Sequence, residues 1–244
     1  MKHTFAFLFS LFLVCNSSEM NAQEKKTDSI PAKTYRYGVR FGVDVSKIAR
    51  ALYEKDYQGI EIVGDYRLTK KYYIAGEFGN ENKTVNDERL NFTTKGTFFK
   101  VGVDYNLYEN WLDMENMVYI GARYGASSFS QTLNSYKIYN RDTYFGFPEN
   151  IKSGEEFTGL TAQWVEILLG VKAKVVNNFY VGFSLRINKL FANKRPDNFD
   201  NLFIPGFNRT YDGTFGAGFN YTISYFLPIY KKKSTQLPTK KAEK

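Results

Sequence analysis

Apolar and polar residues alternate with a period of two along most of the chain. In the first such segment, Tyr35, Val39 and Phe41 alternate with Arg36 and Arg40. Successive side chains of a strand point to opposite faces, so this pattern predicts a strand with one apolar face. The pattern recurs in segments 35–45, 60–68, 72–78, 99–107, 118–126, 165–173, 179–187 and 215–225. No residue on the apolar faces of these segments is charged. Eight such alternating segments along the chain predict an all-β protein.

The opposite faces of the same segments collect charges of both signs. These residues are Arg36, Arg40, Asp44, Glu61, Asp65, Arg67, Glu77, Lys100, Asp104, Arg123, Glu166, Lys172 and Arg186. A soluble barrel would place such charges in water, whereas a membrane barrel places them in its lumen and presents the apolar face to lipid. The near balance of cations and anions favours the membrane barrel, because a narrow lumen needs its buried charges paired. We therefore predict a lumenal charge network.

The connections between the segments alternate in length. The gaps are 46–59, 69–71, 79–98, 108–117, 127–164, 174–178 and 188–214. Outer-membrane barrels have long extracellular loops, short periplasmic turns and periplasmic termini. The sequence thus predicts an eight-stranded antiparallel up-and-down transmembrane β-barrel over 34–229, followed by a disordered Lys-rich periplasmic tail over 230–244.

The first residues have the form of a targeting segment. A short basic start precedes an apolar run too short to span a bilayer, and Ala22 supplies a small residue for cleavage. We expect a signal peptide over 1–22 and a periplasmic segment over 23–33. Cleavage would remove His3 and Cys15, the chain's one His and one Cys. That loss excludes disulfides, thiolate or imidazole metal sites and His-dependent catalysis, so we expect no cofactor, no metal and no enzyme activity.

Several motifs resemble those of small outer-membrane barrels of Bacteroidota. They are the Asn21-Ala22-Gln23 cleavage region, the glycine-rich amphipathic strands and a last strand running from Phe219 to Phe226. More narrowly, the chain resembles a family of such barrels of unknown function. The resemblance implies insertion by the outer-membrane barrel-assembly machinery and implies no particular activity. It differs in one respect: such barrels often end on an aromatic residue, whereas this chain continues past Phe226 into a lysine-rich tail.

The two longest predicted loops, 127–164 and 188–214, are rich in aromatic residues. In the first, the candidate contact residues are Tyr136, Tyr139, Tyr144, Phe145 and Phe147. These side chains could stack on sugars or grip a protein partner, or they could form an apolar cluster that folds the loop over the barrel mouth.

The net charge of +8 adds little about partners, because a secreted barrel does not meet nucleic acid in the usual sense. We expect outer-membrane lipids and lipopolysaccharide as its surroundings, and the sequence leaves the oligomeric state open. The predicted function is a structural or binding barrel of the cell outer membrane, with its lumen closed by charged side chains. The alternatives are a soluble periplasmic barrel that carries an apolar ligand and an outer-membrane enzyme acting on lipid.

Overall fold

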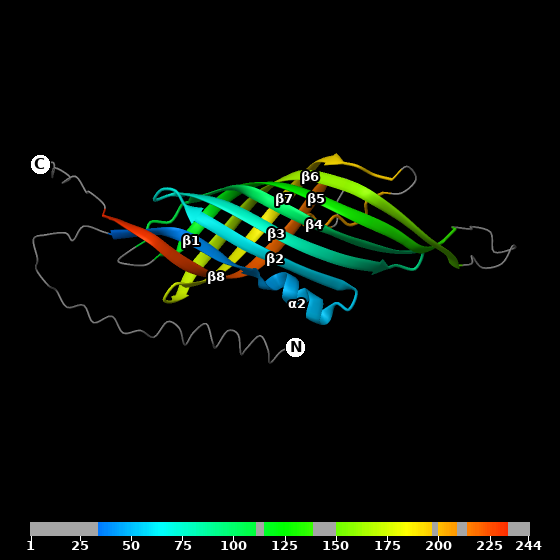
Figure 1. Cartoon of the computed structure of the whole chain (residues 1–244), viewed down its shortest axis with the longest axis horizontal. Coiled ribbons are helices and arrows are strands. Elements are labelled where there is room, and N and C mark those ends of the chain that lie inside the picture. The colour runs from blue at the N-terminus through cyan, green and yellow to red at the C-terminus, as the bar shows by residue number, and fades with distance from the viewer. Residues whose placement is uncertain (1–33, 111–114, 139–149, 197–199, 209–213, 234–244) are drawn as a thin grey trace, which may run out of the picture. The chain divides into compact units, whose positions relative to one another are not determined.

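A computed structural model describes residues 34–110, 115–138, 150–196, 200–208 and 214–233 (Figure 1). The predicted signal peptide, the segment 23–33 and residues 234–244 of the predicted tail lie outside this part of the chain. Within it, no helix has the length and apolarity needed to cross a bilayer.

Eight strands of the described chain form one closed antiparallel barrel in which each strand pairs with its neighbours in sequence and β1 pairs with β8. The strands are β1 (Thr34–Asp44), β2 (Tyr57–Arg67), β3 (Tyr72–Asn86), β4 (Leu90–Asn106), β5 (Met117–Lys137), β6 (Asn150–Val176), β7 (Phe179–Asn193) and β8 (Phe215–Lys233). This confirms the predicted fold class. Short connections at 68–71 and 177–178 lie at the same end as Thr34 and Lys233, which we call the terminal end. The connections 45–56 and 87–89, and residues 194–196, 200–208 and 214 of the β7–β8 connection, lie at the opposite end, which we call the loop end.

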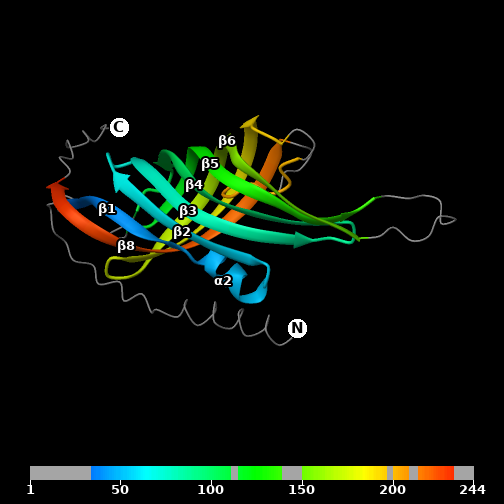
Figure 2. The ribbon, with the colours of Figure 1, turned by 45° about the vertical axis from the view of Figure 1, so that its right-hand side comes forward.

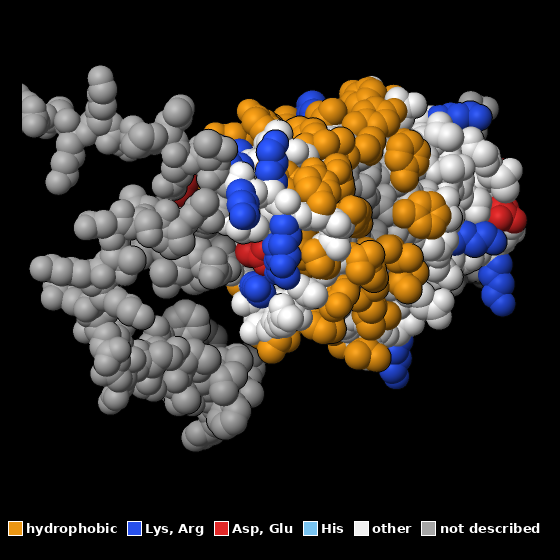
Figure 3. Space-filling view, turned by 60° about the vertical axis from the view of Figure 1, so that its left-hand side comes forward, with side chains coloured by type: hydrophobic (Ala, Val, Ile, Leu, Met, Phe, Trp, Pro, Cys, Tyr) orange, Lys and Arg blue, Asp and Glu red, His pale blue; other side chains and the backbone are white. Residues whose placement is uncertain are grey.

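The two faces of the strands are divided as the alternation predicted. In β6, Ile167 is 63% exposed whereas its neighbour Glu166 is 1% exposed. The same apolar-out pattern holds for Ile62 in β2 and for Ile187 in β7. Figure 3 shows the resulting apolar side chains as a continuous band on the visible face of the barrel. We call this surface the outer band.

Several strands are longer than the alternation indicated. The β3–β4 pairing continues to Asn86↔Asn91, and the β5–β6 pairing continues to Lys137↔Asn150, so much of the predicted loops 79–98 and 127–164 is strand. Figure 2 shows these hairpins reaching beyond the rest of the barrel. In the protruding part of β6, from Asn150 to Glu156, every residue is exposed. Since both faces meet water there, no apolar face marks the strand in the sequence.

The other end of the last strand also extends past the predicted boundary at 229. β8 continues through Lys233, and its final residues pair with the start of β1 from Thr34↔Lys233 to Tyr37↔Tyr230. A bulge between Tyr37 and Gly38 accommodates Pro228, which cannot donate to the ladder. Residues 230–233, expected as disordered tail, are therefore part of the barrel.

The predicted loop 46–59 instead contains a helix, α2 (Val45–Tyr53). Asp44 ends β1 and caps this helix, because its side chain accepts a hydrogen bond from the Ser46 backbone N–H at 2.9 Å. Asn220 of β8 also donates to the Asp44 carboxylate. The cap turns the chain at the loop end and brings the helical residue Lys47 into the barrel interior, where it is 9% exposed.

Candidate functional site: the barrel interior and its two ends

The middle of the interior is occupied by a connected set of ion pairs. Arg186 donates to both carboxylate oxygens of Glu77, at 2.6 and 3.0 Å, and to Glu166 Oε2 at 2.9 Å. Lys100 Nζ lies 3.3 Å from Glu77, 3.5 Å from Glu166 and 3.6 Å from Glu61. The indole N–H of Trp164 donates to the remaining oxygen of Glu166 at 2.7 Å. Each of these carboxylates is buried and faces more than one cation or donor.

Two further groups extend this set. Arg123 Nη2 lies 2.7 Å from Asp104 Oδ1, and Arg123 Nε lies 3.5 Å from Glu77. Asp65 joins Arg40 at 2.8 Å and Lys172 at 2.6 Å. A cavity of about 30 Å³ remains between these groups, which is room for about one water molecule. We call the ten charged residues Arg40, Glu61, Asp65, Glu77, Lys100, Asp104, Arg123, Glu166, Lys172 and Arg186 the central network.

Three of the thirteen residues predicted for the lumenal network make their contacts outside the central network. Asp44 caps α2, as described above. Arg67 donates to the backbone carbonyls of Thr69, Lys70 and Arg36 at the terminal end. Arg36 pairs with Glu115, a residue of the β4–β5 connection.

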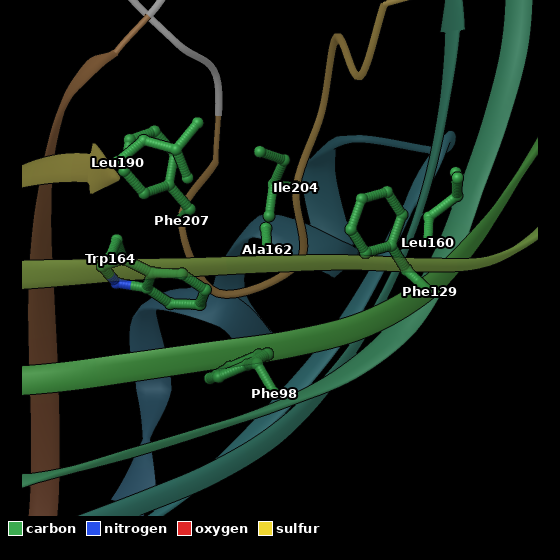
Figure 4. Packing of buried hydrophobic residues seen from close by; sticks show 8 residues of the cluster. All are labelled: Phe98, Phe129, Leu160, Ala162, Trp164, Leu190, Ile204 and Phe207. Carbon is green, nitrogen blue, oxygen red and sulfur yellow. The ribbon is translucent and has the colours of Figure 1, made fainter. Parts of the chain in front are cut away.

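At the loop end, the interior is filled by part of the β7–β8 connection. Residues 201 and 203–207 are buried, and Ile204 and Phe207 are each 0% exposed. Phe207 packs edge-on against Trp164 at a ring distance of 5.7 Å. Figure 4 shows the cluster, whose members are Phe98, Phe129, Leu160, Ala162, Trp164, Leu190, Ile204 and Phe207. We call residues 200–208 the plug segment.

A buried carboxylate holds the turn of the plug segment. Glu81 Oε2 accepts the Gly206 backbone N–H at 2.6 Å, while Glu81 Oε1 accepts from Lys47 and Tyr57 at 2.5 Å each. Gly206 has φ 81°, and a Cβ there would stand 2.4 Å from the Phe98 ring, so the position requires glycine. The plug segment is thereby tied to both α2 and the barrel wall.

Two clefts open at the loop end. One, of about 620 Å³, lies between α2, β2, β3 and the plug segment and includes Lys47, Arg50, Glu54 and Phe203 in its lining. Burial would raise the pKa of Glu54, but hydrogen bonds from Arg50 and Lys83 outweigh it and hold that pKa below its ordinary value. The carboxylate is therefore ionised and paired at neutral pH.

The second cleft, of about 840 Å³, lies along the β5–β6 extension. Tyr136, one of the predicted contact residues, lines it together with Phe157, Glu156 and Arg195. The other four predicted contact residues, Tyr139, Tyr144, Phe145 and Phe147, lie outside the described residues. For the predicted loop 188–214, the burial of Phe203 and Phe207 agrees with the apolar-cluster interpretation and not with a contact surface.

Sequence reasoning missed Lys47, Tyr57, Glu81 and Glu115, because each lies in or beside a segment that we assigned to a connection. The amphipathic spacing of Ile48 and Leu52 after the capping pair Asp44 and Ser46 could have revealed α2. No group of three or more His, Cys, Asp or Glu side chains in the described chain is arranged to hold a metal ion.

A family model described as a domain of unknown function, DUF6048, matches residues 1–232, and the chain belongs to this family. No curated protein matches the chain. Among solved structures, that of Ail, the attachment invasion locus protein of Yersinia pestis, is similar with a TM-score of 0.39 and 12% identity, over 78% of this chain and 97% of Ail. Ail in complex with the heparin analogue sucrose octasulfate gives a TM-score of 0.35, with the same identity and coverage.

Proposed function

We propose that this DUF6048 chain is an outer-membrane β-barrel with a closed interior that acts by binding at its loop end. The observation that carries the proposal is the inversion of the two strand faces: apolar side chains surround the barrel, and charged side chains fill it. Large apolar patches on soluble monomers are rare, whereas an apolar band is what a membrane barrel presents to lipid.

The contents of the interior support a closed lumen. An eight-stranded barrel is just wide enough for its own side chains to fill it. Here the central network occupies the middle, and the plug segment and its aromatic cluster occupy the loop end. We therefore expect no steady ion conductance.

The loop-end clefts support binding over a purely structural role. Both clefts have volumes in the range of ligand sites and combine aromatic with charged side chains. In the proposed orientation, both chain termini are periplasmic, as in other outer-membrane barrels. The loop end then faces outward, next to lipopolysaccharide, and insertion depends on the barrel-assembly machinery.

The interior argues against the two alternatives. A carrier of an apolar ligand needs an apolar cavity inside the barrel, but the cavity at its middle is about 30 Å³, and six of its thirteen lining residues are charged. The described residues contain neither His nor Cys, so they offer no imidazole base or thiolate nucleophile. The proposal includes no catalytic step.

Envelope fractionation combined with a detergent gel tests the proposal. We expect the protein in the outer-membrane fraction, with unheated and boiled samples migrating differently because the closed barrel resists detergent. Recovery in the soluble fraction would contradict the membrane assignment. Steady, ion-selective currents in planar bilayers would contradict the closed interior.

A further inference from the structure

A cleft of about 440 Å³ lies at the terminal end, on the outer side of the barrel. The start of β1, the β2–β3 turn and the end of β8 form it together. Its lining residues are Tyr35, Tyr37, Leu68, Thr69, Lys70, Tyr230, Lys232 and Lys233. Tyr35 and Tyr37 are spaced two residues apart in β1, in phase with Val39 and Phe41 of the outer band, so all four side chains point to the same face of the strand. The cleft therefore adjoins the surface that we assign to lipid.

Stacked aromatic rings form the floor of this cleft. Tyr37 and Tyr230 are nearly parallel, with ring centroids 5.0 Å apart and an interplanar angle of 6°. Tyr37 is 6% exposed under this stack, whereas Tyr230 is 46% exposed. The β1–β8 pairing places Tyr37 directly opposite Tyr230, beside the bulge between Tyr37 and Gly38, so the strand register brings the two rings together.

Cations surround this floor. Arg67 lies over the rings of Tyr35 and Tyr37 at 5.3 and 5.2 Å, and Lys70 Nζ lies 4.8 Å from the Tyr35 ring. Lys232 and Lys233 are exposed at the end of β8. Among the described residues that line the cleft, none is acidic. Figure 3 shows Lys and Arg side chains on both sides of the apolar band, with Asp or Glu side chains among them.

This combination fits one class of ligand. A phosphate group accepts hydrogen bonds from lysine ammonium groups, and the described residues that line the cleft include three lysines and no acidic residue. The adjoining outer band, including Leu68 and Leu227, offers an apolar path on which acyl chains could lie. A free anion would use the lysines alone, whereas an anionic phospholipid would use both the lysines and the apolar path.

We infer that this cleft is a docking site for the headgroup of an anionic phospholipid, of the phosphatidylglycerol type, from the periplasmic leaflet of the outer membrane. The inference rests on the proposed function, because only a membrane-inserted barrel with periplasmic termini places the cleft at that leaflet. A phospholipid bound in this cleft would hold the terminal end at a fixed depth in the bilayer. It would also cover the place where the start of β1 pairs with the end of β8.

Native mass spectrometry of the full chain folded in detergent tests the inference. Phosphatidylglycerol and phosphatidylcholine of identical acyl chains are the probes, and inorganic phosphate is the competitor. We expect phosphatidylglycerol to bind more tightly, and K70Q/K232Q/K233Q to weaken it roughly tenfold or more through the loss of three cations. The arginine variant K70R/K232R/K233R should keep the preference.

The matched control is K95Q/K189Q/K194Q, which removes the same charge at the loop end. An equal loss of binding in this control would overturn the site, since it would show a general charge effect. Retained binding in K70Q/K232Q/K233Q, or complete displacement by millimolar phosphate, would also overturn it. A heat-modifiable barrel in the outer membrane without lipid preference refutes this inference alone, whereas a soluble, unmodifiable protein refutes the proposed function.

Discussion

The outer band and the central network are built from the same strands, yet they follow opposite rules. Ile167 and Glu166 are adjacent in β6, and the apolar residue is 63% exposed while the charged one is 1% exposed. In a water-soluble protein, burying a charge while exposing an apolar side chain would be unfavourable on both counts. The difference indicates that the medium outside the barrel is itself apolar.

The two regions also differ in how much each residue depends on its neighbours. A residue of the outer band faces the apolar medium around the barrel and has no specific partner, so one apolar side chain can replace another. A residue of the central network meets specific partners: Glu77 contacts Arg186, Lys100 and Arg123. If one residue of the network is removed, its partners keep their charges in a buried space, where water cannot take the place of the lost ion pair.

The largest expected effect follows from this dependence. Glu77→Ala leaves Arg186, Lys100 and Arg123 facing fewer anions, and we expect it to lower the free energy of unfolding by about 3–5 kcal/mol. Urea titration of the barrel in lipid vesicles, followed by loss of the unheated gel band, measures this change. Glu155→Ala, at an exposed position of β6, is the control and should have little effect. Equal stability of the two variants would show that the network is not a buried set of ion pairs.

A charge in the outer band should have a smaller but clear effect. Ile167→Arg places a cation toward the acyl chains, at a cost of about 2–4 kcal/mol near the bilayer midplane. The same titration should show this loss, whereas Ile167→Leu should be near wild type. For a soluble barrel the arginine would lie in water at almost no cost, so an unchanged unfolding midpoint would argue for that alternative.

The smallest effect concerns a carboxylate outside the strands. Burial would raise the pKa of Glu115, but hydrogen bonds from Arg36 and Tyr180 and the charge of Lys174 outweigh it, so that the pKa lies below its ordinary value. A lowered pKa means that the ionised form stabilises the fold above about pH 4.3 and loses this effect as the pH falls through the folded-state value.

Glu115→Gln should therefore destabilise the barrel by about 1–2 kcal/mol at pH 7 and by much less at a pH below the folded-state pKa, where the wild-type carboxyl is also neutral. Unfolding midpoints of both proteins at the two pH values supply the comparison. If the difference between the proteins were the same at both pH values, the ion pair with Arg36 would not be its source.

The alternation in the sequence was sufficient to predict the barrel, and ten of the thirteen charged residues that it assigned to the polar face are those of the central network. A period of two separates Glu166 from Ile167 without any knowledge of partners. The contacts that close the loop end depend instead on residues far apart in sequence, such as Trp164 with Phe207 and Glu81 with Gly206. Nothing local in the predicted loop 188–214 distinguishes aromatic residues that fill the barrel from ones that face a partner.

The polar extensions of β5 and β6 were unpredictable for the opposite reason. Their side chains meet water on both faces, so the alternation that marks a half-buried strand is lost there. Asp44 illustrates a third limit: it shares the polar face of β1, but its place directly before α2 makes it a helix cap instead of a network member.

Depth-dependent quenching in a bilayer tests the central claim most directly. Single-cysteine variants at Ile167 and Ile187 in the outer band, and at Lys95 as a comparison outside it, would carry a fluorescent label in the folded, lipid-embedded protein. Lipids brominated on their acyl chains should quench the labels at Ile167 and Ile187 strongly and the label at Lys95 weakly. A water-soluble quencher that reached the labels at Ile167 and Ile187 as well as the label at Lys95, with no quenching by the brominated chains, would contradict the membrane barrel.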